Sequence, residues 1–106
     1  MNMVLYKRQS RHCFTGIYAE MCCGKLTITR HELDDDDDID EAESFTYFNE
    51  WHTAKLMKAL EVETPHELLV ALKKRFRREH WDTGLDRRIR EFCDGQGIKY
   101  RTSVYY

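Results

Sequence analysis

The sequence predicts an α+β fold in which about three helices pack against a small antiparallel sheet, in the order β-β-(β)-α-α-α-β. Three observations predict it. Residues 26–31 alternate with the two-residue period of a half-buried strand, a helix-capping sequence occupies 64–67, and residues 98–106 alternate again. An N-terminal hairpin and a C-terminal strand would form the sheet, and the middle of the chain would supply the helices.

The first third of the chain is predicted to form strands. Residues 3–7 give a short candidate, and longer candidates at 14–22 and 26–33 flank Cys23-Gly24-Lys25. Glycine adopts positive φ without steric cost, so Gly24 favours a tight turn and a β-hairpin. Residues 44–48 fit either a further strand or the lead-in to a helix.

Two helices are predicted in the middle of the chain. Asn49 is an N-cap candidate with Glu50 in the first turn, and a stripe at helical spacing follows: Trp51, Ala54, Leu56, Met57 and Leu60. Thr64 before Pro65, with Glu67 closing a capping box, begins the second helix. That helix should end near residue 80, with Leu68, Leu69, Leu72 and Phe76 on its apolar face.

A third helix is predicted from residue 82 or 83, with Gly95 or Gly97 as its stop. Its apolar face would carry Leu85, Ile89, Phe92 and Cys93. Residues 98–106 then form a strand that rejoins the hairpin, because Ile98, Tyr100, Thr102, Val104 and Tyr106 share one side.

Length and composition predict one domain, residues 1–106. A chain of 106 residues with 42% hydrophobic residues supports a single core. No apolar run reaches the length of a membrane span, and the N-terminus lacks the apolar region of a signal peptide. Four cysteines show no disulfide framework: Cys13, Cys22, Cys23 and Cys93. We therefore expect a cytoplasmic protein with reduced thiols and no membrane association.

The most informative segment is an acidic stretch at 32–43, which contains no basic residue. Its nine carboxylates are Glu32, Asp34, Asp35, Asp36, Asp37, Asp38, Asp40, Glu41 and Glu43. Five consecutive aspartates are poor helix and strand formers, so the stretch is predicted to be a solvated loop or an exposed face. A plain hydrophilic connection is one interpretation. An EF-hand is excluded because no register supplies its central glycine.

A second interpretation of the acidic stretch is mimicry of nucleic acid. Duplex DNA carries one charge per ~1.7 Å of its axis, and adjacent carboxylates approach that linear density. Such a surface would enter a basic nucleic-acid-binding groove of a partner protein. Aromatic residues follow at once, and Tyr47 and Trp51 are candidate interface anchors. The alternative is that Phe45, Tyr47 and Trp51 point into the core.

Basic residues gather on the second and third predicted helices, where eight lie between Lys73 and Arg90. The candidate nucleic-acid-binding residues are Lys74, Arg75, Arg78, Arg87 and Arg88. Pairing of this region with the acidic stretch, within or between chains, is equally compatible with the sequence. No catalytic, cofactor-binding or metal-binding motif is present, so we expect a non-enzymatic protein without a cofactor.

The chain has a general likeness to a known group of proteins. The likeness rests on its size, the Asp34–Asp38 run and the neighbouring Phe45-Thr46-Tyr47-Phe48 segment. The chain resembles small inhibitors encoded by phages and mobile elements, especially anti-CRISPR proteins, and toxin-immunity proteins share the style. The resemblance implies a non-catalytic inhibitor whose partner is a nuclease or its ribonucleoprotein complex. We expect the chain itself to be a monomer or a weak homodimer. A small nucleic-acid-binding or regulatory module that uses residues 73–90 is the alternative.

Overall fold

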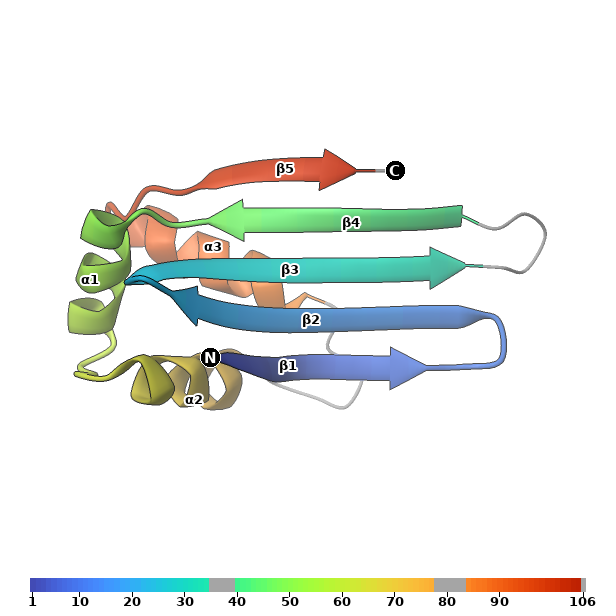
Figure 1. The fold of residues 1–106 in the computed structure, drawn as a ribbon, viewed down its shortest axis with the longest axis horizontal. Helices are drawn as coiled ribbons and strands as arrows, with labels where there is room; N and C mark the ends of the chain where they lie inside the picture. Colours follow the sequence, from blue (N-terminus) through green and yellow to red (C-terminus); the bar gives the residue numbers. More distant parts are fainter. Residues whose placement is uncertain (35–39, 78–83, 106) are drawn as a thin grey trace.

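The computed structural model describes residues 1–34, 40–77 and 84–105. The strands of this described chain are β1 (Asn2–Gln9), β2 (Cys13–Cys22), β3 (Lys25–Asp34), β4 (Asp40–Tyr47) and β5 (Arg101–Tyr105). They form one antiparallel sheet in sequence order (Figure 1). The helices α1 (Glu50–Ala59), α2 (Pro65–Phe76) and α3 (Leu85–Gly95) lie between β4 and β5. The α+β prediction is therefore confirmed.

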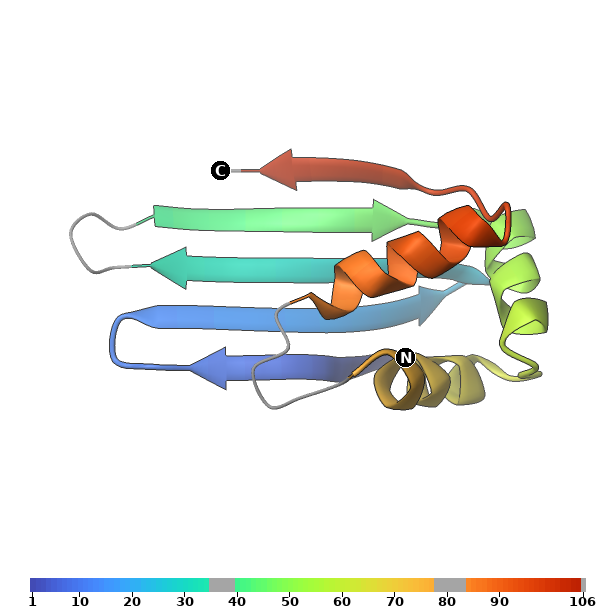
Figure 2. The ribbon, with the colours of Figure 1, turned by 180° about the vertical axis from the view of Figure 1, so that it is seen from behind.

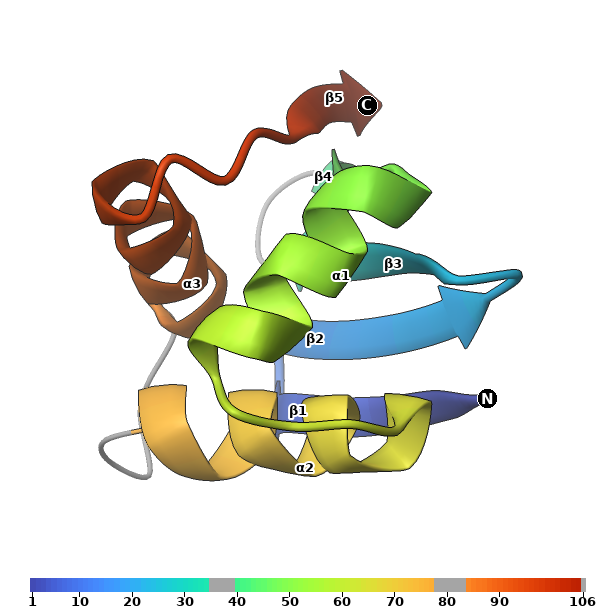
Figure 3. The same cartoon turned by 90° about the vertical axis from the view of Figure 1, so that its left-hand side faces the viewer.

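The helices lie on one side of the sheet. Figure 2 shows α2 and α3 against one face, and Figure 3 shows α1 crossing the end of the sheet. Within the described part of the chain, no helix lies on the opposite face. We call that opposite face the open face. It is the surface of the sheet that remains available for contacts outside the domain.

Strands β3 and β4 reach into the acidic stretch, so the first of the two predictions for 32–43, a loop, is wrong at both ends of the stretch. The two strands pair from Thr27 opposite Tyr47 to Asp34 opposite Asp40, so both ends of the stretch belong to the sheet. Backbone pairing along this hairpin outweighs the low strand propensity of its acidic residues. The lead-in to α1, left open by the sequence, is settled by the same pairing, because residues 44–47 lie in β4.

The turn between β2 and β3 has the positive φ angles expected from the presence of Gly24. Cys23 has φ of 56° and Gly24 has φ of 76°, which are the positive angles of a two-residue type I′ hairpin turn. On the edge strand β1, the pairing register shifts between Val4 and Tyr6. This bulge lets the consecutive residues Leu5 and Tyr6 both enter the core.

The buried face of α1 differs from the predicted stripe. Trp51 is 75% exposed and Ala54 is also exposed, whereas Thr53, Leu56 and Leu60 are buried. Thr53 faces the sheet because its Oγ1 accepts a hydrogen bond from the backbone N–H of Leu26, at 3.1 Å. A buried polar residue therefore fixes the rotation of α1 about its axis. Hydrophobic spacing alone predicted a different buried face.

The helix caps and the apolar faces of α2 and α3 agree with the sequence predictions. Asn49 and Thr64 cap α1 and α2 through their side chains, as predicted. The predicted apolar faces of α2 and α3 are buried or packed against the core. Helix α2 ends at Phe76, before the predicted end near residue 80, because Arg77 is already extended. None of the described helices has the length and apolar character needed to cross a membrane.

Candidate interaction surface

One line of side chains on β4 joins the acidic stretch to the aromatic segment. Thr46 is buried on the helix side, where its Oγ1 accepts a hydrogen bond from Arg90. Side chains alternate along a strand, so the odd-numbered residues of β4 point to the open face. These residues are Glu41, Glu43, Phe45 and Tyr47. The strand thus presents two carboxylates and two aromatic rings in one row, which spans about 20 Å.

The aromatic end of this row is a packed cluster. The rings of Phe45 and Tyr47 stack with centroids 5.8 Å apart, and Tyr105 meets Phe45 edge-on at 5.6 Å. The guanidinium of Arg101 lies 5.9 Å from the Tyr47 ring centroid. Tyr105 is 60% exposed, while Phe45 and Tyr47 are half-buried. Rigid aromatic side chains that remain accessible are typical anchors of protein interfaces.

The acidic end of the row includes a histidine from β3. His31 Nε2 lies 2.7 Å from Glu41 Oε1, and His31 is directly opposite Glu43 in the register. Phe14 on β2 contacts the His31 ring edge-on at 5.7 Å. Lys7 on β1 lies over the ring of Phe14, at 5.9 Å from its centroid. Lys7, a cationic residue of the first hairpin, therefore flanks the acidic end of the open face.

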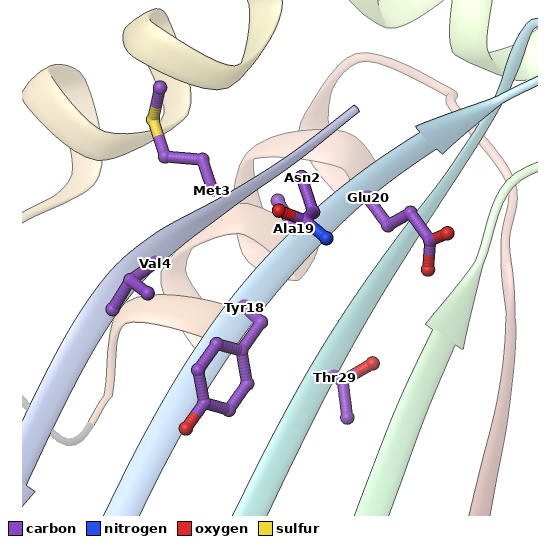
Figure 4. Close-up of a pocket in the computed structure, with 7 residues that line it drawn as sticks. All are labelled: Asn2, Met3, Val4, Tyr18, Ala19, Glu20 and Thr29. Atoms are coloured by element: carbon purple, nitrogen blue, oxygen red, sulfur yellow. The ribbon is translucent and has the colours of Figure 1, made fainter.

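A shallow pocket of about 320 Å³ extends the open face over β1, β2 and β3. Figure 4 shows Val4, Tyr18 and Thr29 side by side on this surface, while Met3 points to the other side of the sheet. The Tyr18 ring lies over Gly16, where a Cβ would come within 2.3 Å of the Tyr18 hydroxyl oxygen. Glycine at this position therefore lets the tyrosine lie flat along its own strand.

Glu32, predicted to contact a partner, lies on the opposite side of β3 from His31. Its Oε1 accepts a hydrogen bond from Arg30 Nε at 2.8 Å. Arg30 Nη1 also pairs with Asp86 of α3 at 3.0 Å, and Arg90 Nη1 pairs with the other oxygen of Asp86 at 3.2 Å. Glu32 therefore belongs to an internal ion-pair network that joins the sheet to α3.

The remaining predicted partner residues are divided between different places. The structure brings Glu41, Glu43 and Tyr47 together on the open face. Asp34 ends β3 opposite Asp40, which begins β4. Trp51 lies apart on α1, where it borders a shallow groove with Ala54, Lys55 and Lys58. The run Asp35, Asp36, Asp37 and Asp38 lies outside the described residues, as does Arg78 of the basic set.

Several of the predicted nucleic-acid-binding cations make contacts within the chain. The Arg88 Nε–H donates to the backbone oxygen of Phe76 at 2.9 Å, at the end of α2. The Arg75 guanidinium lies 5.0 Å from the Phe92 ring centroid, and Arg87 Nε is 3.6 Å from a carboxylate oxygen of Glu91. Lys74 is exposed on α2. Arg75 and Arg88 therefore join α2 to α3, a role that the sequence count did not indicate, whereas Arg87 pairs only within α3.

Sequence reasoning missed several residues of the open face: Phe14, Tyr18, His31, Arg101 and Tyr105. A signal for the first three was present, because they alternate with the buried Ile17, Ala19 and Ile28 along β2 and β3. No such signal indicated that His31 lies opposite Glu43. It depends on the register between β3 and β4, which periodicity does not give.

The cysteine thiols are free, and they differ in burial. Cys13, Cys22 and Cys23 are exposed, whereas Cys93 is fully buried. Desolvation raises the pKa of Cys93 to about 12. The hydrogen bond between the Cys22 and Cys23 thiols, whose sulfur atoms are 3.6 Å apart, raises the pKa of Cys22. Both shifts run opposite to that of a thiol activated as a nucleophile.

Comparison with protein families, with curated proteins and with solved structures finds no match to this chain. The surface itself must therefore indicate the function. The open face combines accessible aromatic rings with carboxylates at one end and with Lys25, Lys99 and Arg101 around a pocket at the other. Such an arrangement is suited to recognition of a surface that carries charges of both signs.

Proposed function

We propose that this protein is a non-catalytic inhibitor that binds another protein through the open face of its sheet. The observation that carries the proposal is the continuous row on β4, where Glu41 and Glu43 lead directly into Phe45 and Tyr47. Carboxylates steer association with a basic surface, and the aromatic rings supply the contact area that holds the complex together. The site thus contains both parts that a tight interface needs.

The proposed partner surface is a basic nucleic-acid-binding groove, such as that of a CRISPR effector nuclease. The acidic stretch at 32–43 gives the chain nine carboxylates in twelve residues, with Asp34 and Asp40 at the paired ends of a hairpin. A dense array of negative charge competes with phosphates for lysine and arginine side chains. Binding there would block entry of the nucleic acid without any chemical step.

The test measures inhibition of DNA cleavage by a panel of CRISPR effector ribonucleoproteins, together with association rates for any complex. We expect near-stoichiometric inhibition by the natural sequence and at least tenfold weaker inhibition by a Glu41→Gln, Glu43→Gln, Tyr47→Ala variant. Glu61→Gln with Glu63→Gln makes a matched charge change at exposed positions before α2 and should leave inhibition unchanged. Inhibition that is absent throughout the panel, or equally strong in all variants, would contradict the proposal.

The central aspartates are tested separately. Replacement of Asp34–Asp38 by asparagines should retain the fold and slow association several-fold, because electrostatic steering acts mainly on the association rate. The difference should shrink as salt increases, since a Debye length is about 8 Å at physiological ionic strength. An unchanged association rate at low salt would rule out the acidic stretch as a mimic of nucleic acid.

A second candidate function is binding of single-stranded nucleic acid on the same face. The observation that favours it is the stacked pair of Phe45 and Tyr47 beside Arg101, near a pocket of about 490 Å³ that Lys25 and Lys99 also line. Bases stack on such rings, and nearby cations hold the phosphates. Direct binding of a labelled oligonucleotide at low salt, lost in Tyr47→Ala and Arg101→Gln, would select this function over protein inhibition.

A further inference from the structure

Three potential metal ligands converge at the acidic end of the open face. His31 lies on β3 directly opposite Glu43 on β4, and Glu41 lies two residues before Glu43 on the same face. His31 Nε2 is 2.7 Å from Glu41 Oε1. The ligand atoms of the three residues all lie within 4.8 Å of one another. Small rotations of the glutamate side chains would bring all three ligand atoms within reach of one small cation.

The charges of this cluster are only partly balanced within the chain. Glu41 and Glu43 are like charges that share one face of the strand. Among the described residues, the His31 ring is the one side chain that hydrogen-bonds Glu41, and Glu43 has no ion-pair partner. Two neighbouring carboxylates repel each other, and a divalent cation between them would remove that repulsion.

Two adjacent strands hold the ligands in place. Backbone pairing of β3 with β4 fixes the spacing between His31 and Glu43, and the edge-on contact with Phe14 at 5.7 Å restrains the imidazole ring. Ligands on paired strands are positioned more firmly than ligands on a free loop. The cluster is also accessible, because the His31 side chain is 29% exposed and that of Glu41 is 55% exposed.

The ligand types select the kind of metal. Calcium and magnesium prefer ligand sets made of oxygen alone, whereas an imidazole nitrogen with carboxylates suits first-row transition metals. We propose that His31, Glu41 and Glu43 form a binding site for a divalent transition-metal ion of the Zn²⁺ type. Three protein ligands leave a coordination position for water or for a group from a partner.

Titration calorimetry with Zn²⁺ tests this site, in a Cys13→Ser, Cys22→Ser, Cys23→Ser background that removes the exposed thiols as competing ligands. We expect binding at one site, with nitrogen-15 NMR showing the largest shift at the His31 imidazole. His31→Gln, Glu41→Gln and Glu43→Gln should each weaken Zn²⁺ binding at least tenfold. Zn²⁺ should also raise the Tm of the background protein and leave that of His31→Gln unchanged.

Matched controls separate this site from general acidity. Glu32→Gln removes one carboxylate on the opposite face of the same strand, and replacement of Asp34–Asp38 by asparagines removes the central run. Both changes should alter Zn²⁺ affinity less than threefold. Affinity that is unaffected by His31→Gln, or lost with the central aspartates, would overturn the proposal and assign metal binding to the acidic run.

The metal site does not depend on the proposed inhibitor function. Zn²⁺ binding is measured on the isolated protein, and His31→Gln leaves the aromatic part of β4 intact. Inhibition assays with and without a chelator then determine whether a bound ion affects the partner contact. A failure to bind Zn²⁺ would leave the inhibition result unchanged, so each proposal is tested by its own measurement.

Discussion

Arg30 on β3 pairs with Asp86 on α3, with 3.0 Å between Arg30 Nη1 and Asp86 Oδ1. Asp86 is 4% exposed and lies between two arginines, because Arg90 Nη1 contacts its second oxygen at 3.2 Å. Arg90 continues the network to Thr46 on β4, while Arg30 continues it to Glu32. Side chains from β3, β4 and α3, which are far apart in sequence, thus join the acidic strands to the helix layer.

Asp86→Asn should destabilise the fold. The change leaves Arg30 and Arg90 without their shared counter-charge in a part-buried position, and loss of one partner of such a network costs about 2–4 kcal/mol. The free energy of unfolding, measured by urea denaturation, gives the loss. Glu91→Gln on the same helix breaks an exposed pair with Arg87 and should cost less than ~0.5 kcal/mol. Equal losses in the two variants would contradict a structural role for the network.

Thr53→Val should weaken the attachment of α1 to the sheet. The substitution keeps the shape of the side chain and removes the oxygen that accepts the Leu26 backbone N–H. A buried donor without an acceptor costs about 1–3 kcal/mol. Denaturant unfolding should show that loss, and hydrogen exchange at the Leu26 amide should accelerate. Thr53→Ser retains the acceptor, so it should protect this amide much as the natural residue does.

Gly16→Ala should move the Tyr18 ring off the open face. The added methyl group overlaps the far end of the ring, and because Tyr18 is part-exposed the ring can rotate away, so the cost should stay below the ~1–3 kcal/mol of overpacking in a rigid core. NMR chemical shifts of Tyr18 should report the displacement. In a Tyr18→Ala background the same alanine substitution should cost nothing, because the overlapping ring is gone. A full cost in that background would place the strain in the backbone of β2 instead.

Cys93 should remain unlabelled by a thiol reagent at pH 8 while the exposed Cys13, Cys22 and Cys23 react. Its alkaline behaviour gives a second test. The folded thiol has a pKa of about 12, whereas an unfolded cysteine titrates near ~8.5. Between these values the unfolded chain binds fewer protons, so the free energy of unfolding falls as pH rises, by roughly 2 kcal/mol from pH 8 to pH 10. Cys93→Val should show a smaller fall over the same range.

The sequence predicted the fold where local chemistry decides it. Side chains of Asn49 and Thr64 cap the helices that they were expected to begin, and Gly24 lies at positive φ in the hairpin turn. These features depend on a few adjacent residues. The predicted apolar stripe of α1 was wrong at Trp51, because the rotation of α1 follows from the distant hydrogen bond between Thr53 and Leu26.

The candidate site was only partly visible in the sequence. Glu41, Glu43 and Tyr47 were identified by composition and position, and strand alternation places them on one face. Glu32 was assigned to the same surface, but it lies on the other face and pairs with Arg30. Neighbouring residues of a strand point to opposite faces, whereas side chains of a loop do not alternate in this way. The prediction of a loop therefore could not separate Glu32 from Glu41 and Glu43.

The sequence by itself determined that this chain forms a sheet with helices on one side, and that its densest charge is the acidic stretch at 32–43. Periodicity, caps and turn residues act locally, so they can be read along the chain. Only the tertiary structure decided that His31 meets Glu41 and Glu43, and that Asp86 reaches Arg30. Both contacts join residues on different elements, and strand register and helix packing decide which side chains meet.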